Sequence, residues 1–381
     1  MYGHVSGRYS RLFLTAVLAA ILVIAALILS SCGTPSFNQE VSQKIEQAIR
    51  EVMEGLDIPG AVAGVWIPDM GELVLSIGEA DIEDGRAVQT ADRFRIGSIT
   101  KTFTATAVLK LVDEGLLSLD DTVDKFVAGI PDGDKITVRQ LCNHTSGLFN
   151  YGEDEDFAAA LTEDPHKVWT PRELVDDAIS HEPYFPPGEG WHYSNTGYIL
   201  LGMIIEEVTG SSYEAVIKDR IIESLGLSNT SLASSPEMTG QYSHGYEYKE
   251  EGSKELIDRT EYLDPSIVWA AGAMISNLED LRIWARALVE GELLSDASHK
   301  EQMDWVDLPD DPDSKYGLGV LYVFGLEGHD GRQPGYDAAV FYYPLRQATF
   351  VILFNKAEQS SVALGVALKL ANIVLPEDIS F

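Results

Sequence analysis

The distribution of strand-like and helix-like segments along the 381 residues constrains the fold of this chain more than any other feature. Strands are predicted near both ends, at residues 61–66, 72–77, 320–324, 338–343 and 349–354. The middle third has helical periodicity, at residues 138–143, 171–180, 197–208 and 213–225. We therefore expect an α/β (α+β) fold in which one antiparallel sheet is built from the N- and C-terminal segments.

Further helices are predicted beside these strands. One runs from Glu40 to a stop at residues 57–60, one follows Ser98 and ends near Gly115, and two lie at residues 278–289 and 361–374. The expected organisation is one domain over residues 39–381. Its sheet lobe covers about residues 39–103 and 265–381, and a mainly helical lobe of about residues 104–264 is inserted between them.

Residues 1–31 have the composition of a secretory leader and are not counted as part of the fold. Arg8 and Arg11 precede a nearly unbroken apolar run at residues 12–29, and small residues follow before Cys32. Leu-Ser-Ser-Cys at residues 29–32 resembles the lipobox of prokaryotic lipoproteins, which predicts cleavage after residue 31, lipidation of Cys32 and a tether at residues 32–38. The alternatives are an uncleaved signal anchor, since the run is long enough to span a membrane, or ordinary secretion. Each places the folded part outside the cytoplasm.

The cysteine content limits the possible disulfides, and the charge limits the possible binding partners. The chain has two cysteines, Cys32 and Cys142, so a lipid on Cys32 leaves no intramolecular disulfide. With 27 basic and 60 acidic residues, the net charge is −33, which argues against binding to nucleic acid or anionic lipid. The acidity fits either a surface adapted to high salt or solubility beside a membrane.

Two short motifs carry the candidate chemistry. Ser98 and Lys101 lie three residues apart where a loop meets a predicted helix, so one turn brings the amine to the hydroxyl. A serine is a poor nucleophile until a base takes its proton, and a lysine can do so when burial lowers its pKa. Tyr193 and Asn195, two residues apart, can project a phenol and an amide together from a loop. These residues predict a serine acyl-transfer enzyme.

A third segment lies at residues 328–332, with the sequence Gly-His-Asp-Gly-Arg, just before a predicted strand. It is interpreted as part of a glycine-rich loop at residues 328–335. A main-chain N–H group here can complete an oxyanion hole opposite Ser98.

With these residues, the chain resembles the penicillin-recognising serine hydrolases, in the branch of class C beta-lactamases, DD-peptidases and related esterases. Ser98 with Lys101 resembles the first motif of that family, residues 193–195 the second, and residues 329–331 the His-x-Gly found in many members. Supporting stretches lie at residues 141–148, 185–191, 271–276 and 316–319, so the similarity covers about residues 40–355. The resemblance implies a beta-lactamase/transpeptidase-like fold.

The resemblance also implies the role of each site residue. Ser98 attacks a carbonyl and is acylated, and Lys101 and Tyr193 share the proton transfers, with either as the base. Asn195 binds the substrate amide, and His329 lines the pocket. The list of substrate-binding residues is completed by Gly331, which lets the substrate lie along the strand, and by Arg332, whose N–H joins that of Ser98 in the oxyanion hole.

Asp330 departs from the family pattern, which has Thr, Ser or Gly at this place to meet a substrate carboxylate. Two carboxylates repel each other. Either Asp330 points away, or Arg332 neutralises it, or the substrate has no such acid. This departure counts against penicillins and peptides ending in D-Ala.

Other chemistries find little support. The zinc motif His-Glu-x-x-His and the Gly-x-Ser-x-Gly elbow are absent from the sequence. The acids at residues 153–156 are interpreted as a solvated loop, and Trp191 as a packing residue. His144 and Ser146 are too close in sequence to face each other and are interpreted as structural. No metal or organic cofactor is expected.

The sequence therefore predicts a membrane-anchored, extracytoplasmic serine hydrolase acting through an acyl-enzyme. The expected substrates are small molecules or peptides with bonds of the D-Ala-D-Ala or beta-lactam type. A carboxylesterase of the same fold is the alternative. A catalytically inactive penicillin-binding-like protein is the rival from another class, and the presence of Ser98, Lys101 and Tyr193 together argues against it.

Overall fold

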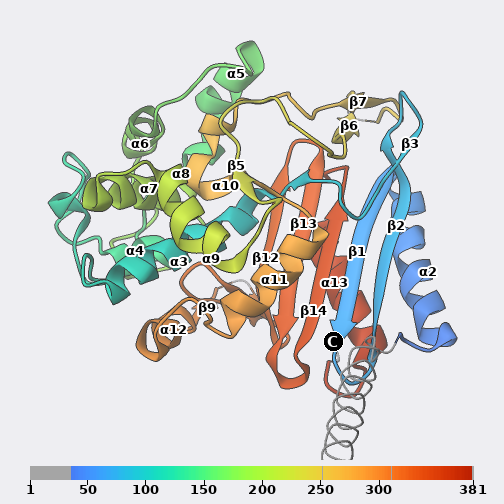
Figure 1. Ribbon diagram of the computed structural model, residues 1–381. Helices are drawn as coiled ribbons and strands as arrows, with labels where there is room; N and C mark the ends of the chain where they lie inside the picture. Colours follow the sequence, from blue (N-terminus) through green and yellow to red (C-terminus); the bar gives the residue numbers. More distant parts are fainter. Residues whose placement is uncertain (1–35, 251, 310, 380–381) are drawn as a thin grey trace, which may run out of the picture.

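A nine-stranded antiparallel sheet forms the centre of the protein (Figure 1). The computed structural model describes residues 36–250, 252–309 and 311–379. The predicted leader, the lipidation at Cys32 and most of the tether lie outside these residues. The strand order is β3-β2-β1-β14-β13-β12-β11-β10-β9.

The two ends of the chain meet in the middle of this sheet, which confirms the predicted fold. Strand β1 (Gly60–Ile67) pairs with β14 (Ala348–Phe354) over six residue pairs, from Ala61 opposite Phe354 to Trp66 opposite Thr349. Two strands that follow β1 and five from the C-terminal part of the chain complete the sheet: β2 (Gly71–Asp81), β3 (Arg86–Ala87), β9 (Val306–Leu308), β10 (Asp311–Tyr316), β11 (Leu321–Val323), β12 (Leu326–Gln333) and β13 (Tyr336–Tyr343).

Both faces of the sheet are covered, because side chains of β1 and β14 alternate between two hydrophobic cores. Ala61, Ala63 and Phe350 join the core under α2 (Gln39–Gly55) and α13 (Val362–Val374). Val62 and Val351 join the core on the other face, which contains α11 (Leu278–Val289). Every side chain of β1 and β14 is buried, as expected for a central strand.

The helical part lies beside this sheet, with α7 (Asn195–Thr209) at its centre (Figure 1). Around α7 lie α3 (Thr100–Asp113), α4 (Val138–Cys142), α6 (Pro171–Ile179), α8 (Tyr213–Ile217) and α10 (Trp269–Gly272). Outside them lie α5 (Glu155–Glu163), α9 (Glu223–Leu225) and α12 (Asp296–Gln302). Short strands complete the fold: β4 (Phe94–Arg95), β8 (Met274–Ser276) and β5 (Ser231–Leu232) pair in one sheet, and β6 (Tyr246–Tyr248) with β7 (Leu256–Asp258) in another.

Two local predictions were wrong. The segment at residues 328–335, interpreted as a loop, is mostly strand β12, held by pairing with β13 from Glu327 to Gln333. The acids near residue 154 are not a plain loop, because Asp154 caps α5 and accepts the N–H groups of Asp156 and Phe157. The helical segment predicted at residues 213–225 is confirmed, and its middle part, Lys218–Ile222, is a π-helix between α8 and α9.

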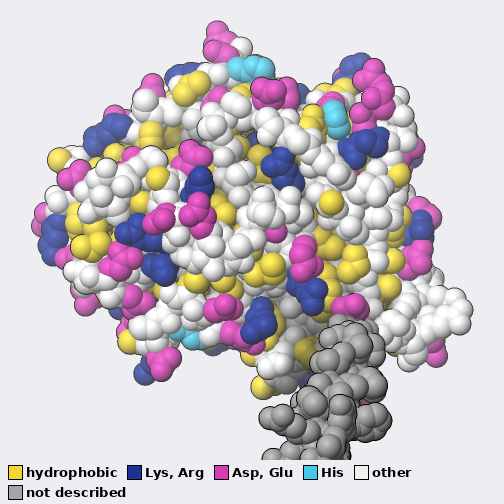
Figure 2. All heavy atoms as spheres, viewed as in Figure 1, with side chains coloured by type: hydrophobic (Ala, Val, Ile, Leu, Met, Phe, Trp, Pro, Cys, Tyr) yellow, Lys and Arg dark blue, Asp and Glu magenta, His cyan; other side chains and the backbone are white. Residues whose placement is uncertain are grey.

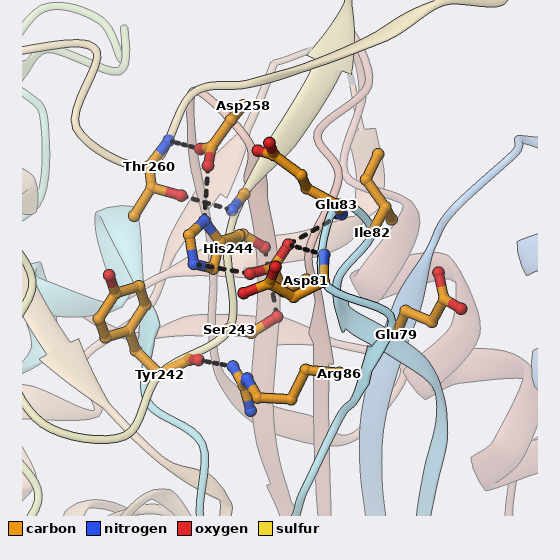
Figure 3. A network of polar contacts seen from close by, with 12 residues as sticks. Glu79, Asp81, Ile82, Glu83, Arg86, Tyr242, Ser243, His244, Asp258 and Thr260 are labelled. Atoms are coloured by element: carbon orange, nitrogen blue, oxygen red, sulfur yellow. Dashed lines mark hydrogen bonds and ion pairs between the residues drawn. The ribbon is translucent and has the colours of Figure 1, made fainter.

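A polar network ties the β6–β7 hairpin to the end of β2 (Figure 3). His244 lies between two carboxylates, with Nδ1 2.5 Å from Asp258 and Nε2 3.6 Å from Asp81. Arg86 donates to the Tyr242 carbonyl and forms an ion pair at 3.1 Å with Asp92, whose side chain is fully buried. The network joins segments that are more than 150 residues apart in the sequence.

The surface is mixed in charge. Figure 2 shows acidic side chains spread over the visible face among lysines and arginines, rather than gathered in one patch. Among the helices that the structure describes, none has the length and apolar character needed to cross a membrane.

Candidate active site

Ser98 lies on a 3₁₀ turn (Gly97–Ile99) that leads directly into α3. Two glycines bring this turn against strand β12. A Cβ atom at Gly331 would lie 2.1 Å from the Ile96 carbonyl oxygen and 2.7 Å from the Ser98 nitrogen, and one at Gly97 would lie 2.5 Å from the Arg332 nitrogen. Gly97 also has a φ of +50°, which favours glycine. The glycines therefore allow the Ser98 turn and the Arg332 main chain to touch.

Lys101 is the candidate base for Ser98, and its amine lies beside the serine hydroxyl. Its Nζ lies 3.0 Å from Ser98 Oγ and donates to the Ala271 carbonyl at 2.8 Å. The residue is 0% exposed, and burial holds the pKa of Lys101 well below its usual value, while the Asp330 carboxylate acts in the opposite direction. Because no carboxylate forms an ion pair with this amine among the described residues, an uncharged amine is favoured beside the serine.

Tyr193 completes the arrangement. Lys101 Nζ lies 4.8 Å from the centre of the Tyr193 ring. The Tyr193 hydroxyl is buried and has no hydrogen-bond partner among the described residues. Burial raises the pKa of Tyr193, and the nearby Ser98 side chain lowers it by a smaller amount. The phenol is therefore held protonated, its hydroxyl is buried, and its ring lies beside the Lys101 amine.

Asn195 is the first residue of α7, and its placement depends on the segment around Asn150. The Asn195 N–H donates to Asn150 Oδ1 at 3.1 Å, and Thr196 Oγ1 donates to the Phe149 carbonyl at 2.7 Å. A Cβ at Gly152 would lie 3.6 Å from Asn195 Nδ2. The Asn195 side chain is partly exposed and remains available to a substrate.

The predicted residues of β12 have different surroundings. His329 is buried, with Nε2 2.8 Å from the Tyr316 hydroxyl, and burial lowers its pKa. The Asp330 side chain is 23% exposed. The Arg332 guanidinium is exposed and donates to the carbonyl oxygens of Glu358, at 3.0 Å, and Gln359. It is therefore occupied away from Asp330, so it does not pair with that carboxylate.

Sequence reasoning missed two aromatic residues of this site. His144, interpreted as structural, has its ring centre 4.3 Å from that of Tyr193, and Tyr316 contacts both His144 and His329. The only sequence signal for either was membership of a stretch that resembles the family. Proximity to Tyr193 cannot be read from a separation of about 50 residues.

One group of possible metal ligands occurs among the described residues. Asp154, Asp177 and His181 each offer a ligand atom, and these atoms lie within 4.8 Å of one another. All three are partly buried and are separate from Ser98 and Lys101. The group adds no residue to the serine site.

The chain is similar to known proteins over most of its length. The family profile named Beta-lactamase matches residues 45–372. The chain is 32% identical to Penicillin-binding protein 4* of Bacillus subtilis (strain 168) over 79% of this chain and 68% of that protein. Its structure is similar to that of a D-stereospecific amidohydrolase from Streptomyces sp., with a TM-score of 0.79 and 35% identity over 88% of this chain and 99% of the other. It is also similar to D-amino acid amidase from Ochrobactrum anthropi SV3 in complex with L-phenylalanine amide, with a TM-score of 0.77 and 27% identity over 89% and 98% of the two chains.

Proposed function

The chain belongs to the beta-lactamase family of serine hydrolases, and we propose that it cleaves amide bonds of the D-Ala-D-Ala or beta-lactam type through an acyl-enzyme on Ser98. The observation that carries this proposal is the distance of 3.0 Å between the buried Lys101 amine and Ser98 Oγ. Membership of the family supports hydrolase chemistry in general, and the site residues support this particular route.

In the proposed mechanism, Ser98 loses its proton as its Oγ attacks the substrate carbonyl. Lys101 is suited to receive that proton because burial lowers the pKa of its amine, which lies within hydrogen-bonding distance of Ser98 Oγ. Tyr193 passes a proton to the leaving nitrogen, so that the C–N bond breaks and the acyl group stays on Ser98. Water then hydrolyses the ester and regenerates the serine.

The remaining site residues stabilise and orient the substrate. The main-chain N–H groups of Ser98 and Arg332 form the oxyanion hole, which the close contact between their segments supports. Asn195 donates to or accepts from the substrate amide. Gly331 and His329 shape this side of the site from β12, the first by close packing and the second through its bond to Tyr316.

A second candidate substrate class is favoured by Asp330. Its charge acts on both Lys101 and Tyr193, which places it near the reacting groups, and Arg332 is engaged with main-chain carbonyl oxygens instead. A carboxylate here repels a substrate carboxylate and attracts an ammonium group. Amides of D-amino acids have an ammonium group and no free carboxylate. The structural similarity to two enzymes named for D-stereospecific and D-amino acid amide hydrolysis is consistent with this class.

The proposal is tested by intact-protein mass spectrometry with a panel of acyl donors: a fluorescent penicillin, a D-Ala-D-Ala peptide, D-phenylalanine amide and p-nitrophenyl acetate. We expect an adduct with the mass of the acyl group, absent in Ser98→Ala. An adduct from the ester alone would identify a carboxylesterase. An absence of any adduct and of any turnover would contradict the proposal and favour a non-catalytic binding protein.

We further propose that the hydrolase is held outside the cytoplasm by a lipid on Cys32, with a signal anchor as the alternative. The support is the leader composition at residues 1–31. Metabolic labelling with a fatty acid should mark the wild-type protein and not Cys32→Ser. A labelled Cys32→Ser protein would refute this assignment.

A further inference from the structure

The segment that carries Tyr193 has no regular secondary structure of its own. Residues 191–194 lie outside any helix or strand, and α7 begins only at Asn195. If Tyr193 transfers protons, its hydroxyl must stay within a fraction of an ångström of its place, since an error of about 1 Å can cost about 10²-fold in rate. Some other part of the molecule must therefore fix this segment.

His144 holds the chain on both sides of Tyr193. Its main-chain carbonyl accepts the His192 N–H at 3.1 Å, and its ring Nδ1 accepts the Ser194 N–H at 3.2 Å. The residues before and after Tyr193 are thus bound by one residue from a distant part of the chain. The His144 ring also lies against the Tyr193 ring, with centroids 4.3 Å apart and planes inclined by 35°.

The placement of His144 is unusual in two independent ways. Its backbone has a φ of +64°, in the left-handed region that few residues other than glycine adopt. Its ring is almost fully buried at 2% exposure, yet Nε2 has no hydrogen-bond partner among the described residues. Strain and an unpaired buried polar atom both cost stability, so a hydrophobic residue would serve better if only packing were needed.

The hydrogen bond to Ser194 also determines the protonation of the ring. Because Nδ1 accepts an N–H, it cannot carry a proton, and the single ring proton of a neutral imidazole lies on Nε2. Burial is the largest cause that lowers the pKa of His144, and it favours a neutral ring. An imidazolium would present an N–H to the Ser194 N–H and break the contact.

We propose that His144 is a positioning residue that fixes Tyr193 for proton transfer by binding the main chain on both sides of it. This inference rests on the proposed function of Tyr193. It assigns to His144 a specific task beyond the structural role expected for it. The task requires an acceptor at the position of Nδ1, and the ring face against Tyr193 contributes packing only.

Two substitutions separate the acceptor from the ring face. His144→Asn keeps an acceptor near the Nδ1 position, and asparagine tolerates the left-handed backbone. His144→Phe keeps a ring and removes the acceptor. The matched control is His299→Phe, which removes a ring-to-main-chain hydrogen bond of 3.0 Å to the Val289 carbonyl, far from Ser98 in the sequence and outside the site.

The measurement is the rate of Ser98 acylation by D-phenylalanine amide or a fluorescent penicillin, together with kcat and KM. An amide donor is used because its leaving nitrogen needs the proton that Tyr193 supplies. We expect His144→Phe to lower the acylation rate on the order of 10²-fold with little change in KM, and His144→Asn to stay within about fivefold of wild type. His299→Phe should acylate at the wild-type rate. An unchanged rate in His144→Phe, or equal losses in both His144 variants, would overturn the inference.

A second measurement does not depend on hydrolysis. Nitrogen-15 NMR of the histidine rings, with His144 assigned by its loss in His144→Asn, should show a neutral ring protonated on Nε2. A proton on Nδ1 would be incompatible with the hydrogen bond from the Ser194 N–H. It would therefore overturn the inference even in an active enzyme. If wild-type Ser98 accepts no acyl group, the proposed function fails, while the NMR result still decides whether His144 binds the Tyr193 segment.

Discussion

Replacing Lys101 by methionine should stabilise the protein at neutral pH while it abolishes acylation. Methionine has a similar length and no charge. Lys101 is 0% exposed and lacks an ion-pair partner among the described residues, so folding either buries its charge or removes its proton. Both alternatives cost free energy that methionine does not. The substitution therefore exchanges a catalytic group for stability.

The difference in unfolding free energy between Lys101→Met and wild type depends on pH. The folded pKa of Lys101 lies below its ordinary value of 10.5, so the folded protein binds fewer protons than the unfolded chain between these two values. In that window the unfolding free energy of the wild type rises by about 1.4 kcal/mol per pH unit relative to Lys101→Met. Above pH 10.5 this contribution vanishes. Below the folded pKa it is constant and at its most unfavourable for the wild type.

The variant also loses the hydrogen bond to the Ala271 carbonyl, which lies 2.8 Å from Lys101 Nζ. An unpaired buried carbonyl costs about 1–3 kcal/mol, but this cost does not depend on pH. The lost hydrogen bond shifts the whole curve of unfolding free energy against pH without changing its slope. The slope is therefore the test of the argument.

The assay is denaturant unfolding of wild type and Lys101→Met, followed by tryptophan fluorescence, from pH 5 to 9.5. We expect the stability advantage of the variant to be level at low pH and then to fall with a slope near 1.4 kcal/mol per unit. The pH at which the slope begins is the folded pKa of Lys101. Lys300→Met, which removes an exposed lysine of α12, is the control and should give a constant difference. Parallel curves for wild type and Lys101→Met would refute the reasoning, because Lys101 would then not be perturbed.

Three further predictions concern other parts of the molecule. Asp330→Thr should raise kcat/KM for substrates with a free carboxylate and lower it for D-amino acid amides, and unchanged ratios in steady-state assays would show that Asp330 does not face the substrate. Arg86→Met should lower the unfolding free energy by up to about 3 kcal/mol, since it leaves the fully buried Asp92 without its ion-pair partner, and the loss is measured by chemical unfolding. Gly331→Ala should abolish acylation and lower the melting temperature, because its Cβ would lie 2.1 Å from the Ile96 carbonyl oxygen; a variant with wild-type acylation would show that β12 can move away.

The sequence was sufficient for strands β1, β2, β13 and β14 of the sheet because the information there is local and redundant. Buried strands such as β1 and β14 are continuous apolar runs, and the helices next to them have clear periodicity. The helix over residues 278–289 was predicted with the bounds that the structure shows. The π-helix at Lys218–Ile222 could not be predicted, because buried residues continue through it at helical spacing, from Tyr213 to Ile221. The Asp154 cap, by contrast, has a sequence signature, an aspartate before an apolar helical face.

Site residues could be predicted from the sequence where their contacts are local, and could not be where the contacts join distant segments. Ser98 and Lys101 meet because three residues at a helix start place them on one face, and the structure gives 3.0 Å between them. Tyr193 could be assigned only through its motif, and His144 not at all, because their contact joins two irregular segments. The pairing of β12 with β13 is another non-local effect. Glycine, aspartate and arginine have low strand propensity, which is why residues 328–335 were interpreted as a loop.

Strand β12 also fixes the distance between the sheet and the Ser98 turn. The resemblance implies that Gly331 lets the substrate lie along the strand. In a paired strand, Gly331 is the position where β12 passes so close to the Ser98 turn that no side chain fits. Pairing with β13 fixes the strand, the glycine sets its distance from Ser98, and the next residue, Arg332, then has its main-chain nitrogen against Gly97. The sheet and the serine turn are thus held in register by backbone contacts, which leaves the side chains of Lys101, Tyr193 and Asp330 free to determine the chemistry and the choice of substrate.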